Sequence, residues 1–393
     1  MHCTQVETKK GKKWVCVADG PPDPITGKRN QIVRRGKTKK EAMERVQKEI
    51  DDIEEHGLLS AEKSKIVFEK FAKEWLETYS PNVKISTVHV RLKEIKTLNK
   101  YIAKVKIEKV TPKMYQNILN DLHKKGYARS TIIGVHSSAS MIFRQAVIWK
   151  MITTSPTNDA VIPKDKITVE EIESNVNPIE KKYLEKNELK EFLEVTTEHG
   201  LPNDKEIFFI LAFTGIRVGE LCALKWSDVD FELGEIRITK TIFSPKNSMK
   251  DYSLLTPKTT TSIRRIKVDE YIIDLLRNHK DRQKAKKTQK QEHHADFLIA
   301  RPNGYPYLEE RVNERMQRIM KRTSIAKHAT PHTLRHTHVS ILTESGIDIK
   351  TIMDRVGHKD MKTTMQIYTH VTQKMKSQAN EKFNKFMSDL LSN

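Results

Sequence analysis

Along the first 57 residues, hydrophobic and polar positions alternate before the pattern changes to a helical period. The stretch VETKKGKKWVCVAD predicts two short strands around a Gly-Lys turn, with Trp14, Cys16 and Ala18 on one face. After a loop rich in Pro, Asp and Gly, residues 31–35 predict a third strand. Thr38 and Glu41 have the spacing of a capping box ahead of a helical stripe. This pattern predicts a small β-β-β-α unit.

Residues 64–150 show the helical period throughout. Apolar residues recur at helical spacing in four stretches, at 67–76, 88–102, 115–122 and 130–149. These stripes predict four helices that each bury one face in a bundle and leave the intervening lysines on solvated faces.

The stretch 151–180 has no strong periodicity and is interrupted by prolines, which predicts a linker. Beyond it the pattern is mixed. We expect a helix from near Asn187, an apolar helix over EIFFILAFTG, strands at 236–239, 252–255 and 263–268, and then mostly helix.

A chain of 393 residues is long enough for two or three domains. The sequence therefore predicts a multidomain α+β protein. Its expected parts are a β-β-β-α domain at 1–57, an all-helical domain at 64–160, a linker at 161–180, and a mixed, mostly helical domain with a small antiparallel sheet at 181–393.

Positive charge is concentrated in two of these regions. The chain has 71 Lys and Arg against 51 Asp and Glu, a net charge of +20. Residues 1–40 hold 11 Lys and Arg against 3 Asp and Glu, and residues 81–150 hold 14 against 3. Such regions suit nucleic acid better than an anionic membrane surface, because no amphipathic Trp/Phe-rich anchor accompanies them.

The rest of the composition favours a cytoplasmic protein. No run of about 18 apolar residues predicts a transmembrane helix, and the N-terminus lacks an apolar signal core. Cys3, Cys16 and Cys222 have no metal-like spacing, and such a sparse, odd set predicts reduced thiols.

The motif FTGIRVGELCALKW places a cation near a predicted helix N-terminus. Thr214 can cap that helix, Gly215 allows close backbone approach, and Arg217 falls in the first turn. A cation at the positive end of a helix is unfavourable unless an anion binds there. Glu220 can orient the guanidinium from three residues away. The alternative is an ordinary surface Arg–Glu pair.

A second motif, ATPHTLRHTHVSILTESG, repeats this arrangement. Thr330 is the predicted N-cap and Pro331 the first helical residue, so His332 and Arg335 share a face near the positive end. The alternative is a zinc site, because His332 and His336 are four residues apart, but no obvious third ligand accompanies them.

The motif DRVGHKDMKTTMQIYTHV contains a candidate nucleophile. A glycine is expected to end one helix just before His358, and a second, short helix carries Tyr368. A tyrosine of ordinary pKa is a poor nucleophile unless cations stabilise the reacting phosphate and the phenolate. The alternative for Tyr368 is a core or surface aromatic residue.

The motif LLTPKTTTSIRRIKV predicts a β-hairpin with Lys258 at its tip. A lysine there can reach into a groove, although an exposed hairpin lysine without a role is the alternative. Three other lysines lie nearby: Lys240, Lys246 and Lys250.

In order, TGIRVGEL, TPKT between strands, HTLRH, GH and a tyrosine ten residues after that histidine resemble the tyrosine recombinase family. The resemblance is densest over 181–375. The helical region before it resembles the core-binding domain of the family. The first 57 residues resemble the arm-binding domain of integrases such as those of lambda and of conjugative transposons.

The resemblance implies a phosphate clamp. Arg217 and Arg335 would hold the scissile phosphate, and Glu220 would support the first of them. His332 would hydrogen-bond the phosphate and assist proton transfer, and His358 would donate to a phosphate oxygen.

The resemblance also implies the reaction, that of a DNA strand-transferase. Tyr368 would attack to form a 3′-phosphotyrosine, and Lys258 would be the general acid for the departing 5′-hydroxyl. No metal and no cofactor is implied, because the phosphotyrosine bond preserves the energy of the bond that it replaces.

The implied function is that of the integrase of a phage or other mobile element. The implied partners are double-stranded DNA at core and arm sites and a homotetramer assembled on DNA, and the resemblance admits an excisionase and a host DNA-bending protein. The place of action would be the nucleoid in the cytoplasm of a bacterial host. Four basic residues of the first domain are expected to contact DNA: Lys12, Lys13, Arg34 and Arg35.

Two other functions remain open. A Xer-like resolvase of DNA dimers usually lacks an extra N-terminal domain, and a DNA-binding regulator would have a decayed catalytic site. The complete set of candidate residues argues against decay.

Overall fold

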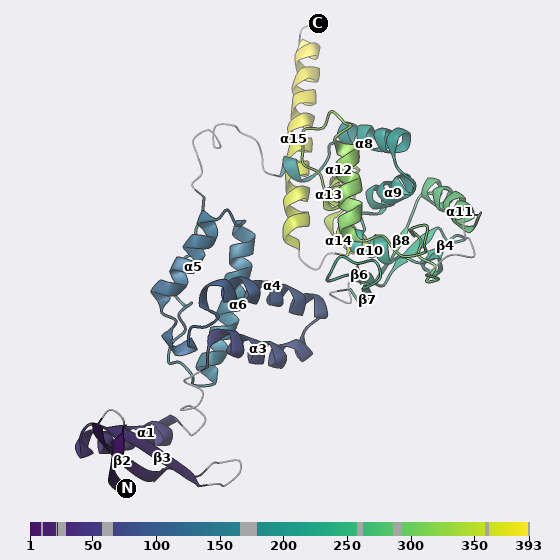
Figure 1. Cartoon of the computed structure of the whole chain (residues 1–393). Helices are drawn as coiled ribbons and strands as arrows, with labels where there is room; N and C mark the ends of the chain where they lie inside the picture. Colours follow the sequence, from purple (N-terminus) through teal and green to yellow (C-terminus); the bar gives the residue numbers. More distant parts are fainter. Residues whose placement is uncertain are drawn as a thin grey trace. The chain divides into compact units, whose positions relative to one another are not determined.

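The computed structural model describes residues 1–8, 11–20, 22, 29–56, 66–165, 179–257, 262–285, 293–357 and 361–391. The chain divides into two compact units, Met1–Ile167 and Thr168–Asn393 (Figure 1). Among these described residues, no helix is both long enough and apolar enough to cross a membrane.

The N-terminal residues form the predicted β-β-β-α unit. The strands β1 (His2–Thr8), β2 (Gly11–Gly20) and β3 (Asn30–Gly36) make an antiparallel sheet in that order. Helix α1 (Lys39–His56) packs on one face of it. The shared core consists of Cys16, Ala18, Ile32, Ala42, Val46 and Ile53.

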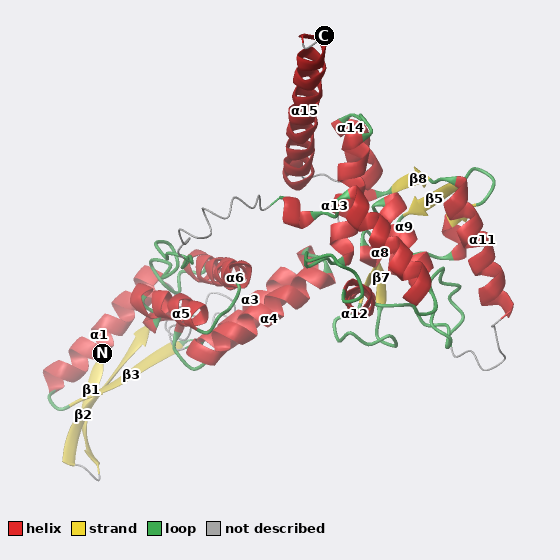
Figure 2. Cartoon of the chain, turned by 90° about the horizontal axis from the view of Figure 1, so that it is seen from above, coloured by secondary structure: helices red, strands yellow, loops and turns green. Residues whose placement is uncertain are grey.

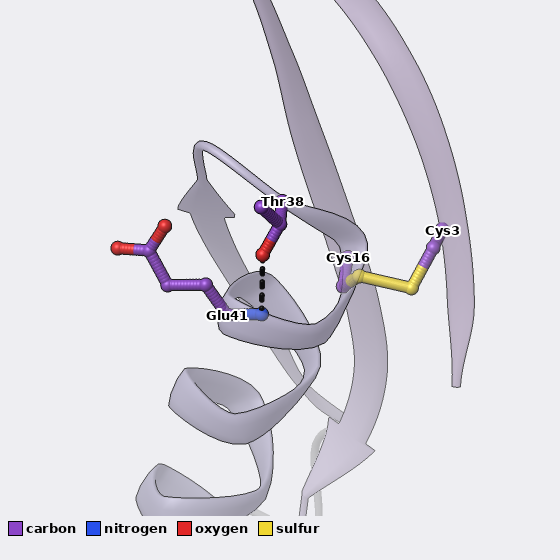
Figure 3. The surroundings of a disulfide bond; sticks show 4 residues. All are labelled: Cys3, Cys16, Thr38 and Glu41. Atoms are coloured by element: carbon purple, nitrogen blue, oxygen red, sulfur yellow. Dashed lines mark hydrogen bonds between the residues drawn. A yellow bond between two sulfur atoms is a disulfide. The ribbon is translucent and has the colours of Figure 1, made fainter.

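The start of α1 is capped by both residues that the sequence indicates. The Glu41 N–H donates to Thr38 Oγ1 at 3.1 Å (Figure 3). The Glu41 carboxylate accepts from the N–H of Lys37 at 2.7 Å, one residue before the expected partner. Two backbone donors at the helix start are thereby satisfied.

A disulfide between Cys3 and Cys16 joins β1 to β2 (Figure 3). The expectation of reduced thiols is therefore wrong for this pair. The antiparallel register places the two cysteines directly opposite each other, and opposite Cβ atoms in such a ladder are about 5 Å apart. The separation of Cys3 and Cys16 in the sequence does not by itself indicate that they are paired. Cys222 is a free, buried thiol.

The helical stripes of the next region are confirmed as four helices: α3 (Phe68–Tyr79), α4 (Ile85–Ile102), α5 (Pro112–Lys124) and α6 (Arg129–Ile148). Their apolar faces form one core, in which the rings of Phe68 and Phe143 lie 5.7 Å apart. The chain after α6 stays on this core, because Met151 and Ile162 pack against it.

The second unit is mostly helical (Figure 2), and its described residues include eight α-helices. They are α8 (Lys186–His199), α9 (Asp204–Thr214), α10 (Val218–Ala223), α11 (Glu270–Ala285), α12 (Glu309–Met320), α13 (Pro331–Glu344), α14 (Ile349–Val356) and α15 (Met361–Leu391). The strongly apolar α9 is buried in the hydrophobic core of this unit, as its composition predicts.

Two small antiparallel sheets complete this unit. One has the order β4 (Val229–Asp230), β5 (Glu235–Ile238), β8 (Arg264–Lys267), and the other pairs β6 (Thr241–Phe243) with β7 (Ser253–Leu255). The expected β7–β8 hairpin is therefore wrong. Each of these strands pairs with an earlier one, because strand partners are chosen by packing as well as by proximity along the chain.

The helix that carries Tyr368 is long, where a short one was expected. Helix α15 runs for 31 residues (Figure 2). No glycine or proline occurs within it, so nothing in the sequence stops it early. Near its start, Ile367 and Val371 are buried with Val339 of α13 and Val356 of α14.

Candidate active site

The N-terminus of α13 is built as the sequence predicts. Thr330 is its N-cap and Pro331 its first residue. Arg335 follows one turn later, and its side chain is fully buried. Its guanidinium donates to the carbonyl oxygens of Gly215 at 2.6 Å and of Val356 at 2.5 Å.

Arg217 reaches the same region from the segment between α9 and α10. Thr214 ends α9, where its hydroxyl donates to the Ile210 carbonyl, and Gly215 caps that end with φ +63°. Arg217 is the N-cap of α10. The expectations that Thr214 begins a helix and that Arg217 lies in its first turn are therefore wrong. The close approach expected at Gly215 is present: a Cβ there would lie 2.6 Å from the His338 ring.

Both arginines converge on the last turn of α14. Arg217 Nη2 donates to the Gly357 carbonyl at 3.1 Å, and Arg335 reaches the carbonyl of the preceding residue, Val356. Gly357 ends α14 with φ +67°, as predicted. We call Arg217 and Arg335 the arginine clamp.

Glu220 holds Arg217 from within the protein. Arg217 donates to this carboxylate from Nη1 at 2.8 Å and from its backbone N–H at 3.0 Å. Glu220 is only 3% exposed, which distinguishes the contact from an ordinary surface ion pair.

The sequence did not single out Arg264 and Arg355. Arg264 donates to Glu220 Oε2 at 2.9 Å and to the Arg355 carbonyl at 2.8 Å. Arg355 Nε donates to Nε2 of the buried His338 at 3.0 Å. A signal for Arg264 was available, because strand alternation puts it on the same face as the buried Ile266, two residues later.

The charges at the clamp favour an anion. Burial alone would raise the pKa of Glu220, but the hydrogen bond and charge of Arg264, together with Arg217, hold it below its ordinary value. Burial, and next the charge of Arg217, lower the pKa of Arg335. Arg217 and Arg264 therefore bind the ionised carboxylate of Glu220, and Arg335 lies within range of its charge. A bound phosphate would offset the electrostatic cost of bringing these cations together.

His332 lies on the first turn of α13, beside the clamp. Enclosure by the protein, and then the charges of Arg335 and Arg217, lower the pKa of His332. The ring is therefore neutral at pH 7 and can both donate and accept a hydrogen bond.

The second histidine of the alternative zinc site, His336, is buried. Its ring centroid is 4.5 Å from that of His332. Burial, and then His332 and Arg335, lower the pKa of His336 to about 3. Within the described ranges, no group of three His, Cys, Asp or Glu side chains is placed to hold a metal ion.

Two candidate residues, Lys258 and His358, lie outside the described residues. Tyr368 lies on α15, half-buried against a core that includes Val339 and Val356. Of the lysines near Lys258, Lys240 is paired with the buried carboxylate of Asp228.

Lys246 is exposed and lies 3.7 Å from an Asp251 oxygen. Lys250 also interacts with other groups of the protein.

The four basic candidates of the N-terminal sheet divide between its two faces. Arg34 is opposite the buried Cys16, and its side chain forms an ion pair with Glu49 of α1. Arg35, the next residue, is exposed and belongs to the face away from α1. By the same alternation, Lys12 shares the face of Arg34 and Lys13 that of Arg35.

Three family models match the chain. Residues 182–375 match the phage integrase family, residues 67–123 the N-terminal SAM-like domain of phage integrases, and residues 5–50 an arm DNA-binding domain.

Similar proteins match over most of their length. A probable integrase of prophage ps2 from Lactococcus lactis subsp. lactis (strain IL1403) is 30% identical over 372 residues, covering 92% of this chain and 95% of that protein. The integrase of Staphylococcus phage L54a is 30% identical over 340 residues, covering 84% and 95%. Among solved structures, the Tn1549 transposon integrase bound to transposon right end DNA matches with a TM-score of 0.64 and 22% identity, covering 77% and 95%.

Proposed function

Because this chain belongs to the phage integrase family and is a tyrosine recombinase, we propose that its arginine clamp holds the scissile phosphate while Tyr368 attacks it. The observation that carries this proposal is the convergence of Arg217 and Arg335 on one turn of α14. Guanidinium groups suit a phosphate because they present paired N–H donors in a fixed plane.

The proposed reaction has two steps. The Tyr368 hydroxyl gives up its proton and its oxygen forms a bond to phosphorus, while the bond to the 5′-oxygen breaks and that oxygen takes a proton from the general acid. A 3′-phosphotyrosine and a free 5′-hydroxyl result. The 5′-hydroxyl of another strand then attacks the phosphorus of the phosphotyrosine. A new phosphodiester forms, and Tyr368 leaves and regains its proton. One phosphate ester replaces another at each step, so the reaction needs no nucleotide cofactor.

The other candidates supply hydrogen bonds and a proton. We assign the general acid to Lys258, the lysine of the TPKT motif by which the chain resembles the tyrosine recombinases. Of the three alternative lysines, Lys240 is paired with Asp228. Neutral His332 assists proton transfer at the phosphate, and His358, next in the chain after Gly357, donates to a phosphate oxygen. Glu220 supports Arg217.

The substrate we propose is double-stranded DNA, bound at core sites and arm sites by a tetramer. In this assignment residues 1–57 bind arm sites, 64–160 bind core sites, 161–180 link the parts and 181–393 catalyse. The match of residues 5–50 to an arm DNA-binding model supports the first assignment and favours an integrase over a Xer-like resolvase. An excisionase and a host DNA-bending protein complete the proposed assembly, which acts on the host nucleoid in the cytoplasm.

The test is covalent capture on a suicide DNA substrate whose cleaved end diffuses away. The wild-type chain should become linked to DNA, and Tyr368→Phe should still bind the substrate but form no adduct. Tyr271→Phe is the matched control, because Tyr271 is an exposed tyrosine of α11. An adduct formed by Tyr368→Phe would assign the nucleophile to another residue. No adduct with any variant, wild type included, would reject the catalytic proposal.

A further inference from the structure

Each of the three guanidinium nitrogens of Arg264, on β8, donates to an oxygen of the protein. It donates to both oxygens of Glu220, at 2.9 Å and 3.4 Å. Its Nε donates to the Arg355 carbonyl at 2.8 Å, and its Nη1 also donates to the Ser262 carbonyl at 3.0 Å. The side chain is 6% exposed, so it is enclosed by these partners rather than presented to a ligand.

These contacts connect the two supports of the arginine clamp. The first support is Glu220, which orients Arg217. The second is the last turn of α14, whose carbonyls accept from Arg217 and Arg335. Arg264 touches both supports at once, although they lie far apart in the sequence.

Gly357 is shaped to admit Arg264. Its φ is +67°, and a Cβ at this position would lie 3.0 Å from Arg264 Nη1 and 3.2 Å from its Cδ. A side chain at position 357 would therefore strain the left-handed backbone and would require Arg264 to shift by a few tenths of an ångström.

Arg355 also holds the last turn of α14 in place, through hydrogen bonds of its side chain. Its side chain donates to His338 Nε2 at 3.0 Å, to the Lys267 carbonyl at 3.1 Å and to the Phe213 carbonyl at 3.3 Å. One residue thus accepts from Arg264 through its carbonyl and binds α13, β8 and α9 through its side chain. The end of α14 is held against three other elements.

Stability alone is a weak explanation for such a network. Removing several charges from water costs about as much as their attraction returns, so buried ion pairs contribute little net stability. The network does fix the direction of Arg217 and the position of two carbonyl oxygens, and phosphoryl chemistry is sensitive to such placement.

We propose that Arg264 is a positioning residue for strand cleavage, acting through Glu220 and the α14 turn to aim the arginine clamp at the phosphate. This inference rests on the proposed function of the clamp. Arg264 is not itself catalytic, because its side chain is enclosed and each of its guanidinium nitrogens donates to an oxygen of the protein.

The experiment compares Arg264→Met with Arg265→Met in the full chain. Arg265 is the neighbouring arginine on the opposite face of β8. Its side chain is 60% exposed and lies 3.5 Å from an oxygen of Glu235. Single-turnover cleavage of a suicide substrate is measured at saturating DNA, alongside DNA affinity and thermal unfolding. We expect Arg264→Met to lower the cleavage rate on the order of 10- to 100-fold, with DNA affinity unchanged, and Arg265→Met to behave as wild type.

Two further readouts separate positioning from general support. In a substrate whose scissile phosphate carries a methyl group in place of one non-bridging oxygen, the negative charge is gone and a correctly aimed arginine matters less. The defect of Arg264→Met should therefore shrink on that substrate. In a double-mutant cycle, Arg264→Met and Glu220→Gln should be non-additive, because both act through Arg217.

Equal defects on both substrates, additive effects in the cycle, or normal cleavage by Arg264→Met would each overturn the proposal. If Arg264→Met does not fold, Arg264→Lys provides the same comparisons, because it keeps the charge but cannot span Glu220 and the Arg355 carbonyl together. Failure of wild-type cleavage would instead count against the proposed function.

Discussion

The N-terminal sheet and the region around the clamp both depend on arginines, but they hold them differently. Arg34 and Arg35 are successive residues of a solvated strand, and the Arg34 side chain is 37% exposed even in its ion pair with Glu49. Arg335 and Arg264 are 0% and 6% exposed and are bound by carbonyl and carboxylate oxygens. Arg217 is as exposed as Arg34, at 37%, but its guanidinium is held by the buried Glu220 and by the Gly357 carbonyl.

The difference teaches what each set can do. Exposed arginines can swing towards a phosphate and are screened by salt, so they suit adjustable binding along DNA. Enclosed arginines are fixed before the substrate arrives and act in a medium of lower dielectric constant, so they suit charge that develops during a reaction. Four predictions test this contrast.

The largest expected effect is at the clamp. Arg217→Ala should lower suicide-substrate cleavage about a thousandfold, because a preorganised donor is lost from the charged phosphate. Arg335→Lys should also cleave poorly, because one ammonium cannot replace a planar guanidinium that spans two carbonyl oxygens.

Arg311→Ala is the matched control for Arg217→Ala. Arg311 and Glu314 are also three residues apart in the sequence, and their side chains are 2.7 Å from each other, but both are exposed. This variant should cleave at the wild-type rate. Normal cleavage by Arg217→Ala would mean that its pair with Glu220 is structurally ordinary after all.

The enclosed network should also make stability depend on pH. Burial, and then Arg355, lower the pKa of His338 to about 3, whereas an unfolded histidine titrates near 6.5. Below about pH 6.5 the unfolded chain binds a proton that the folded chain does not. The free energy of unfolding therefore falls by about 1.4 kcal/mol for each unit by which the pH is lowered. His336 acts in the same direction. Above about 6.5 the contribution is constant.

Urea unfolding on both sides of this pH measures the effect. His338→Gln keeps a donor for the Ala212 carbonyl and an acceptor for Arg355 but cannot titrate. Below about pH 6.5, unfolding of this variant should therefore take up about one proton fewer than unfolding of the wild-type chain. An unchanged slope would show that His338 is not the group responsible.

A smaller effect is expected where Gly357 admits Arg264. Gly357→Ala should cost about 1–2 kcal/mol of stability for the left-handed backbone, and it should also slow cleavage by displacing Arg264. Gly346→Ala is the control, because its φ is +78° but a Cβ there meets no atom within 4 Å. It should lose stability and keep cleavage. Equal cleavage rates in the two variants would argue against the importance of the close approach.

The smallest effect is expected on the N-terminal sheet. Arg35→Ala should weaken arm-site binding. The slope of log K against log salt concentration should become shallower by about 1, because one phosphate contact is lost. Arg34→Ala should change that slope less, because its side chain is already paired with Glu49 on the helix side. Filter binding over a salt series distinguishes them. A larger change in Arg34→Ala would mean that the ion pair opens on DNA.

Much of the fold could be predicted from the sequence, because it depends on neighbours along the chain. The helical period gave α3 to α6, and Thr330 with Pro331 gave the start of α13. Gly357 gave the end of α14. Arg217 and Glu220 were paired correctly, because an N-cap residue lies beside the third residue of the helix that it begins.

Tertiary structure decided the contacts that join distant segments. Cys3 meets Cys16 only because of strand register, β7 pairs with β6 rather than β8, and Arg264 reaches Glu220 across 44 residues. Local patterns show which face of an element is buried, but they do not show which other element covers it. By itself, the sequence determined the order of the elements and the residue types available for chemistry. Packing decided which arginines are enclosed and what holds them, because burial and register depend on the whole folded chain.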